Sequence, residues 1–306
     1  MKDVIVICGA TATSKTKFAV ALAEKLNTEV ISADCMLVYK GLDIGTAKPT
    51  REEMRGVPHH LINVADPGDN FSVSDYRAAA LPIIERLLAE DKSPIICGGT
   101  GFYIDALLYE SAFGSAGASE EIRAKYTAVL SDLGKEKGAA HLHRLLEEVD
   151  PESAAILHEN DVKRVIRALE IYELTGRKKS EQNDTKTPRF SFRAFSVGYP
   201  RETLYERINT RVEDMFSRGL VKEVQNLLNS GVSPAAQCMQ GIGYKEVIEG
   251  ILNGVPWEEI KNNVKQHTRN YAKRQITYFK RMQNHTIIPH KVLEIGENLQ
   301  FMEELL

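Results

Sequence analysis

The chain has 306 residues, of which 43% are hydrophobic and 26% charged, so it can bury a full core, and its length suggests two domains. It contains 39 lysines and arginines against 42 aspartates and glutamates, a formal net charge of -3. This excludes a global positive field for nucleic acid, so any such partner must be met by local patches. The four cysteines form no C-x-x-C pair, which argues against a zinc site or a disulfide framework.

No segment has the pattern of a leader peptide or a membrane helix. The first apolar run, Val4 to Cys8, is too short for the hydrophobic region of a signal peptide. No stretch approaches the roughly eighteen apolar residues that a membrane helix needs. We therefore expect a cytoplasmic protein with no membrane partner, and a monomer, because nothing indicates an obligate hydrophobic interface.

The chain opens with the pattern strand, loop, helix. Residues 4–8 are a short β-branched run, and residues 15–26 carry apolar side chains at helical spacing. The intervening CGATATSKT has the spacing of a phosphate-binding loop, except that Ser14 stands where a glycine is usual. Serine can adopt the left-handed conformation often required there at a cost of roughly 1 kcal/mol, so the departure does not exclude phosphate binding.

Two further polar clusters follow predicted strands. Asp34 comes directly after residues 29–33, and Gly98-Gly99-Thr100 follows residues 94–97. Ligands of open parallel sheets bind at the carboxyl ends of strands, so Asp34 should lie near the phosphate loop if their strands are neighbours. Taken alone, the aspartate could equally cap a turn, and the glycines could form only a flexible turn.

The elements between these clusters predict the fold. Ser72 and Asp75 have the form of a capping box that opens a helix running to about residue 90. Strands that alternate with helices imply a parallel sheet with helices on its faces. We therefore predict an α/β fold, a P-loop NTPase-like parallel sheet flanked by helices.

An inserted helical lobe interrupts this pattern. Residues 118–180 carry only helical periods, residues 192–197 are typical of a returning strand, and helices resume from Glu202. We assign residues 1–112 and 190–306 to the catalytic core with its C-terminal basic helices, and residues 113–189 to the lobe.

The basic C-terminal segment is the clearest candidate for RNA contact. Residues 261–281 contain seven basic residues and no acidic one, and Lys265, Arg269 and Lys273 share one helical face. This pattern favours binding to a phosphate backbone over a merely solvated face, because no acid is interspersed. We expect Tyr271 and Tyr278, a heptad apart, to pack rather than to stack on bases.

Taken in order, these motifs closely resemble the tRNA dimethylallyltransferases, from residue 3 to about residue 282. The later landmarks of the resemblance are Glu159-Asn160-Asp161, Arg207-Ile208-Asn209-x-Arg211, Gly219-Leu220-x-x-Glu223, Gln240-Gly241-Ile242-Gly243-Tyr244-Lys245 and Thr268-Arg269-x-Tyr271-Ala272-Lys273-Arg274-Gln275.

The resemblance implies transfer of a dimethylallyl group from dimethylallyl diphosphate to N6 of adenosine 37, next to the tRNA anticodon, with release of diphosphate. It implies that Asp34 is the catalytic base and that Thr100 hydrogen-bonds the substrate near the breaking bond. Mg²⁺ is the implied cofactor, held partly by Thr16. The implied diphosphate-binding residues are Gly9, Thr11, Ala12, Thr13, Ser14, Lys15, Thr16 and Arg211.

The resemblance also implies a tRNA anticodon arm as partner. The implied contacts are Asp34, Cys35, Met36, Leu37, Arg123, Lys163, Arg164, Arg167, Gly243, Tyr244, Lys245, Arg269, Lys273 and Arg274. The arginines of the lobe have an alternative, because arginines at helical spacing often only pair with nearby carboxylates, here Glu170 or Asp161.

The sequence departs from the family's pattern in segments that face the substrates. The family generally has Ser-Met-Gln after the aspartate, where this chain has Cys35-Met36-Leu37. Leucine cannot hydrogen-bond a base edge, so recognition of adenine is weaker or borne by backbone groups. Ala10 and Ser14 replace proline and glycine in the loop, and Gly241 replaces an alanine.

Three other functions remain open at this point. A dimethylallyltransferase acting on free adenine nucleotides would have less use for the basic segment and the lobe. A small-molecule kinase would account for Lys15 and Thr16 but not for Asp34, Thr100 and the later motifs. A catalytically weakened tRNA-binding protein would account for Ser14 and Leu37.

Overall fold

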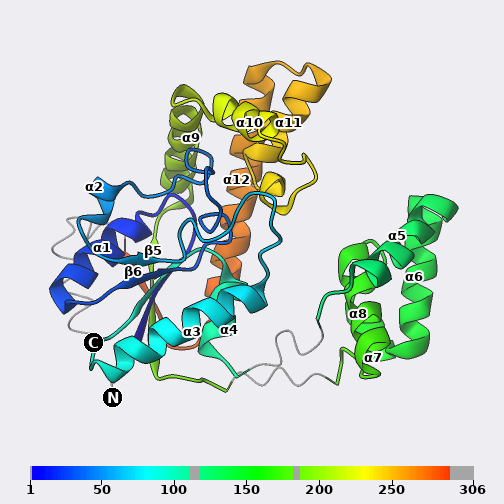
Figure 1. The fold of residues 1–306 in the computed structure, drawn as a ribbon, viewed down its shortest axis with the longest axis horizontal. Helices are drawn as coiled ribbons and strands as arrows, with labels where there is room; N and C mark the ends of the chain where they lie inside the picture. The colour runs from blue at the N-terminus through cyan, green and yellow to red at the C-terminus, as the bar shows by residue number, and fades with distance from the viewer. Residues whose placement is uncertain (1, 111–116, 182–186, 290–306) are drawn as a thin grey trace. The chain divides into compact units, whose positions relative to one another are not determined.

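The computed structural model describes residues 2–110, 117–181 and 187–289 (Figure 1). The chain divides into a core unit, up to residue 109 and from residue 188 onward, and a lobe of residues 110–187. These divisions differ by two or three residues from the predicted boundaries, of which residue 113 lies outside the described residues. In the described part of the chain, no helix combines the length and the hydropathy needed to span a membrane.

The sheet of the core unit is parallel, as predicted, and the described residues contribute six strands to it. They are β1 (Val4–Cys8), β2 (Val30–Ser32), β3 (His59–His60), β4 (Ile95–Gly98), β5 (Phe192–Gly198) and β6 (His285–Pro289), in the order β3-β2-β4-β1-β5-β6. The predictions missed β3 and β6, because two residues are too few to show a period and HTIIP contains only two consecutive apolar residues.

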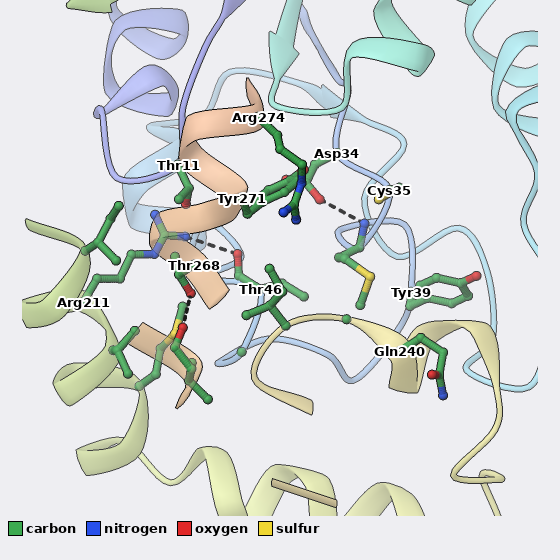
Figure 2. A pocket seen from close by; sticks show the side chains of 18 of the residues that line it. Thr11, Asp34, Cys35, Tyr39, Thr46, Arg211, Gln240, Thr268, Tyr271 and Arg274 are labelled. Atoms are coloured by element: carbon green, nitrogen blue, oxygen red, sulfur yellow. Dashed lines mark hydrogen bonds between the residues drawn. The ribbon is translucent and has the colours of Figure 1, made fainter. Parts of the chain in front are cut away.

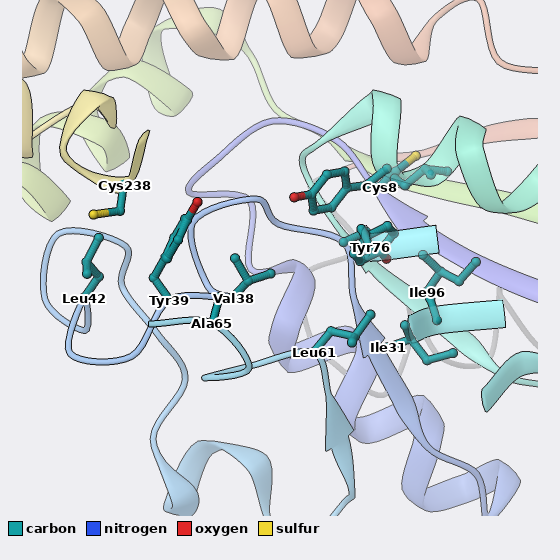
Figure 3. Close-up of a cluster of buried hydrophobic side chains, with 14 of the residues drawn as sticks. Cys8, Ile31, Val38, Tyr39, Leu42, Leu61, Ala65, Tyr76, Ile96 and Cys238 are labelled. Carbon is teal, nitrogen blue, oxygen red and sulfur yellow. The ribbon is translucent and has the colours of Figure 1, made fainter. Parts of the chain in front are cut away.

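Helices cover both faces of the sheet, so its strands are buried on both sides. Along β1, Val4, Val6 and Cys8 point into one core and Ile5 and Ile7 into the other. The first core also receives α3 (Val73–Ala89) and α4 (Gly101–Leu108), and the second receives α1 (Lys15–Leu26). Figure 3 shows part of the first core, where side chains of β2 and β4 meet those of α3 and of the 38–65 segment.

The remaining helices of the core unit are α2 (Arg51–Met54), α9 (Arg201–Ser217), α10 (Leu220–Asn229), the short 3-10 helix η1 (Gln237–Gln240), α11 (Tyr244–Asn253) and α12 (Trp257–Phe279). The predicted capping box of α3 is present, because the Ser72 hydroxyl accepts the amide of Asp75 and the Asp75 carboxylate accepts the amide of Ser72. The two long helices α9 and α12 pack against each other.

The lobe has its own apolar core. Its helices are α5 (Glu120–Leu133), α6 (Lys135–Val149), α7 (Pro151–Ile156) and α8 (Val162–Thr175). Leu142, Leu146, Val165 and Leu169, which the helical periods placed on common faces, are all buried together. The lobe therefore buries enough apolar surface to be treated as a separate folding unit.

A buried carboxylate ties the end of the lobe to its middle. Asp150 is 1% exposed and precedes α7, where its side chain accepts the amides of Ser153 at 3.1 Å and Ser180 at 3.0 Å. Burial opposes ionisation of this carboxyl, yet the hydrogen bonds from Ser153 and Ser180 outweigh burial and lower its pKa to about 2.

Replacing Asp150 by asparagine is expected to destabilise the lobe at neutral pH by roughly 1–2 kcal/mol and to flatten its acid profile. Because the folded pKa lies below the unfolded value, the stabilisation is present above pH 4 and is lost as pH falls through about 2. Urea unfolding between pH 2.5 and 6, with hydrogen exchange to resolve lobe peptides, measures the difference. Asp132→Asn, an exposed site on α5, is the control, and parallel pH profiles for wild type and Asp150→Asn would contradict the assignment.

Candidate active site

The loop between β1 and α1 has the geometry of an anion cradle. Ala12 and Ser14 both adopt left-handed backbone conformations, with φ of 62° and 61°, as the sequence analysis allowed for Ser14. Alternating conformations of this kind turn successive amide groups toward one side of a loop. The carbonyl of Ala10 accepts the Thr13 hydroxyl at 2.8 Å and the Lys15 ammonium at 2.5 Å, so the loop is also held from within.

Two partly buried cations lie beside this loop. Burial lowers the pKa of the Lys15 ammonium, and the nearby Arg211 guanidinium lowers it further. Burial likewise lowers the pKa of Arg211, whose Nε atom is buried without a hydrogen-bond partner among the described residues. Its Nη2 donates only a long bond, 3.3 Å, to the carbonyl of Thr46. A partly buried cation with a buried, unpaired donor is a group that a bound anion would stabilise.

The other two polar clusters meet at the ends of β2 and β4. The Thr100 hydroxyl accepts the amide of Cys35 at 3.0 Å, and the Asp34 Oδ1 atom accepts the amide of Met36 at 2.9 Å. The sequence analysis placed Asp34 near the phosphate loop on the condition that their strands, β2 and β1, are neighbours. They are not neighbours, because β4 lies between them. Gly98 allows this close packing, since a Cβ there would meet the Ala33 carbonyl oxygen at 2.0 Å.

One cavity joins the phosphate loop and the Asp34 cluster (Figure 2). It has a volume of about 380 Å³, and Asp34, Thr11 and Arg211 all line it. Arg274 of α12 lies close to Asp34 in this view, with the ring of Tyr271 beside them. Although Asp34 and the phosphate loop belong to separated strands, both therefore open into the same space.

The wall on the α9 side of the cavity is apolar. Ile208, Val212 and Met215 line it together with Arg211, and their spacing places all four on one helical face. Met215 lies one turn beyond Arg211, about 6 Å along the helix axis. An anion at Arg211 would thus have an apolar surface running away from it.

Sequence reasoning missed a glutamine that fixes the cradle. Gln275 of α12 is 5% exposed, and its side chain accepts the amide of Thr11 at 2.9 Å and donates to the carbonyl of Gly99 at 2.9 Å. The amide of Thr11 is therefore committed to Gln275, although Thr11 was expected to bind diphosphate. Gln275 is the last residue of the motif that begins at Thr268. A single sequence, however, does not indicate that its side chain contacts Thr11, which is 264 residues away along the chain.

Glu223 of α10 holds the loop that forms another wall of the cavity. Its carboxylate accepts the amides of Asp43, Ile44 and Gly45 at 2.8–3.1 Å and the hydroxyl of Tyr244 at 2.7 Å. The next residue along, Thr46, carries the carbonyl that accepts from Arg211. Glu223 thus positions the partner of a buried cation without touching the cavity itself.

The residues expected to contact tRNA in the core unit fall into two groups. Asp34, Cys35, Met36 and Arg274 line the cavity, whereas Leu37 is not among its lining residues. Tyr244 is fully buried and bonded to Glu223, so its ring supports the loop from behind. Gly243 begins α11, and Lys245 lies at the surface within 3.8 Å of Glu249.

The basic stripe of α12 is partly neutralised by another helix. Lys261 and Lys265 both pair with Glu213 of α9. The sequence analysis considered only acidic residues within the segment itself and therefore did not predict this partner. Arg269 donates to Asn209 and Gln266, each at 2.7 Å, while Lys273 is exposed. Arg269, Lys273 and Arg274 lie outside these ion pairs.

The tyrosines of α12 differ from each other. Tyr278 packs as expected, with its hydroxyl donating to Asp105 at 2.6 Å. The ring of Tyr271 instead lines the cavity, where Arg274 lies 5.7 Å from its centre. Tyr271 is therefore placed to contact a ligand, contrary to the expectation that it only packs.

The arginines of the lobe largely serve its structure. Arg123 and Arg167 both bond to Glu170, whose side chain is fully buried and also accepts the amide of Ser119. Arg164 lies 3.2 Å from Asp161. These are the pairings that the sequence left open as the alternative to tRNA contact, and Lys163 is exposed.

A divalent cation would have few protein ligands here. Within the residues that the structure describes, no cluster of three or more His, Cys, Asp or Glu side chains could hold a metal. The Thr16 hydroxyl at the start of α1 is compatible with Mg²⁺, which usually keeps several waters and takes its other ligands from substrate phosphates. The donor set therefore fits a cation that arrives with a phosphorylated ligand.

The family model described as IPP transferase matches residues 37–282. The chain is 44% identical to a tRNA dimethylallyltransferase of Pelotomaculum thermopropionicum, over 92% of this chain and 88% of the relative, and 45% identical to one of Geobacillus kaustophilus, over 91% and 88%.

Two solved structures resemble the whole fold. The full-length tRNA isopentenylpyrophosphate transferase of Bacillus halodurans matches with a TM-score of 0.72 and 38% identity, over 99% of this chain and 96% of that one. A eukaryotic dimethylallyltransferase acting on tRNA matches with a TM-score of 0.80 and 30% identity, over 94% and 74%.

Replacing Glu223 by glutamine is expected to release the loop of residues 43–46, because a carboxamide offers one acceptor oxygen where the carboxylate offers two. Hydrogen bonds to a charged group contribute about 1.5–3 kcal/mol, so the amides of residues 43–45 should exchange at least about tenfold faster. Hydrogen exchange of this segment measures the effect, with Glu259→Gln at an exposed site of α12 as the matched control. Unchanged exchange would show that Glu223 does not hold the loop.

Proposed function

The chain belongs to the IPP transferase family, and from this premise we propose how it transfers a dimethylallyl group to tRNA. The donor is dimethylallyl diphosphate, and the acceptor atom is N6 of adenosine 37. A single observation supports this assignment above the others: the carboxylate of Asp34, the buried guanidinium of Arg211 and the phosphate loop open into one cavity.

The leaving group binds at the cationic end of the cavity. Arg211 and Thr11 of the phosphate loop line this end, Lys15 lies near Arg211, and diphosphate supplies the anion that these partly buried cations need. As the bond between C1 of the dimethylallyl group and its oxygen breaks, negative charge develops on the diphosphate. Cations already in place stabilise that charge without reorganisation.

The dimethylallyl group lies along the apolar face of α9. Ile208, Val212 and Met215 line the cavity on either side of Arg211 and offer the five-carbon chain an apolar surface. An apolar wall also excludes water, which would otherwise compete with the amine for the allylic carbon.

Asp34 accepts the proton that N6 loses. As the N6 lone pair forms the new bond to C1, the proton passes to the carboxylate and the electron pair of the breaking bond leaves with diphosphate. One carboxylate oxygen accepts the amide of Met36, which fixes the side chain and leaves the other oxygen for the amine. The Thr100 hydroxyl accepts the amide of Cys35, so its own hydrogen can be donated, either to the neighbouring Tyr271 or to the substrate.

Mg²⁺ would be held by Thr16 together with the oxygens of the donor, and when bound it would neutralise part of the diphosphate charge. The protein residues do not depend on it to orient the base, because Asp34 and Thr100 are fixed by backbone amides.

The acceptor enters the cavity from the side of α12. N6 of a stacked adenosine cannot reach an enclosed carbon, so the base is flipped out of the anticodon loop. Tyr271 and Arg274 line the same cavity as Asp34 and offer a ring face and a cation to the flipped nucleotide. Lys273 and Arg269 would contact the phosphates nearby. We propose that the protein acts as a monomer in the cytoplasm, where tRNA is available.

A transfer assay tests this function directly. The protein is incubated with Mg²⁺ and labelled dimethylallyl diphosphate, and offered either unmodified tRNA or AMP. We expect label in tRNA, at adenosine 37, because the cavity and the basic residues of α12 suit a macromolecular acceptor. Label in AMP, or binding of tRNA without transfer, would refute the proposal.

Replacing Asp34 by alanine should lower kcat by about 10²–10⁴-fold, the usual contribution of a general base. The affinity for tRNA should change little, because most contacts to the anticodon arm lie elsewhere. Single-turnover rates and tRNA binding, measured on the same samples, separate the two effects. An unchanged rate would remove Asp34 from its role, and a loss confined to tRNA affinity would make it a binding residue.

A further inference from the structure

Arg207 of α9 holds the phosphate loop at two points. Its Nε donates to the carbonyl of Ala12 at 2.8 Å, and its Nη2 donates to the hydroxyl of Ser14 at 2.8 Å. The guanidinium also lies 4.9 Å from the ring centre of Tyr199, a contact that restricts its rotation. The side chain is therefore fixed on three sides, and two of its donors are committed to the loop.

The two residues that Arg207 holds are the two strained positions of the loop. Ala12 and Ser14 have positive φ without being glycine, a conformation that costs roughly 1–2 kcal/mol per residue. Such a conformation persists where the surroundings fix it. Bonds from one guanidinium to both positions provide that constraint.

The loop also rests on α9 and α12 through its alanines. Ala10 and Ala12 form a small buried cluster with Leu204 and Ile208 of α9 and Ala272 of α12. Arg207 extends from the same region of α9, so the apolar contact and the polar contact act on one side of the loop. Arg211, one turn further along α9, lines the cavity assigned to the anion.

We propose that Arg207 is a positioning residue for the donor site, and that the Ser14 hydroxyl is the acceptor through which it fixes the anion-binding conformation of the loop. Ser14 then contributes to the anion-binding loop and does not impair it, because a glycine at this position would have no side chain to accept the hydrogen bond from Arg207. This inference rests on the proposed function, since it concerns the site assigned to diphosphate.

The arrangement makes a specific prediction about which step suffers. Neither Arg207 nor Ser14 shares the roles assigned to Asp34 and Thr100 in the transfer step. Their loss should therefore weaken diphosphate binding and leave kcat at saturating donor unchanged. Because the two residues act through one bond, their effects should overlap and not add.

A double-mutant cycle with inorganic diphosphate and Mg²⁺ as the probe tests this. Ser14→Ala keeps the Cβ but removes the acceptor, and it should raise the Kd for diphosphate about tenfold, as expected for a bond to a charged group. Arg207→Gln should raise it at least as much. The double variant should bind no more than about twofold worse than Arg207→Gln alone, with kcat at saturating donor within about threefold of wild type.

Two further variants separate geometry from charge. Arg207→Lys keeps the charge but cannot make two parallel bonds, so it should remain several-fold weaker than wild type. Arg218→Gln removes an exposed arginine near the end of the same helix, and it should bind diphosphate like wild type.

Several outcomes would overturn the inference. Additive effects of Ser14→Ala and Arg207→Gln, or an unaffected Ser14→Ala variant beside a weakened Arg207→Gln variant, would mean that Arg207 contacts the anion directly. Full rescue by Arg207→Lys would mean that only its charge counts. In each case the wild-type transfer assay is untouched, so failure of this inference is distinct from failure of the proposed function.

Discussion

The structure depends on the partial burial of two cations at one edge of a parallel sheet. Removing Lys15 and Arg211 from water costs free energy, and placing them near each other adds repulsion. Asp34 offsets part of this from across the cavity, and a diphosphate would offset the rest. The carboxyl edge is therefore arranged for a ligand more highly charged than any side chain there.

Holding such a site open requires rigid support, and the second half of the chain provides it. Gln275 fixes Thr11, Arg207 fixes Ala12 and Ser14, and Glu223 fixes the loop that contacts Arg211. The residues assigned to chemistry come mainly from the first hundred positions, whereas these supports come from α9, α10 and α12. The site is thus complete only when the sheet and the C-terminal helices have assembled around each other.

Local patterns in the sequence predicted the sheet, the phosphate loop and the insertion of a lobe, because each is written in residues close together along the chain. The supports of the loop could not be predicted, since Gln275 and Thr11 are joined only by the fold. The basic stripe shows the same limit: Glu213, on another helix, pairs with two of its lysines. Two-residue β3 lies below the length at which any period can be recognised.

The point where the lobe joins the core unit bears on how the chain folds. Tyr109 and Pro188 pair directly in an antiparallel bridge, so residues 110–187 are an insertion whose two ends are held together. Closing a loop costs entropy that grows with the logarithm of its length, by about 0.6 kcal/mol for each doubling. Because the four lobe helices bury a core of their own, their prior folding would shorten the effective loop. The inserted lobe then adds little to the entropic cost of pairing β5 with β1.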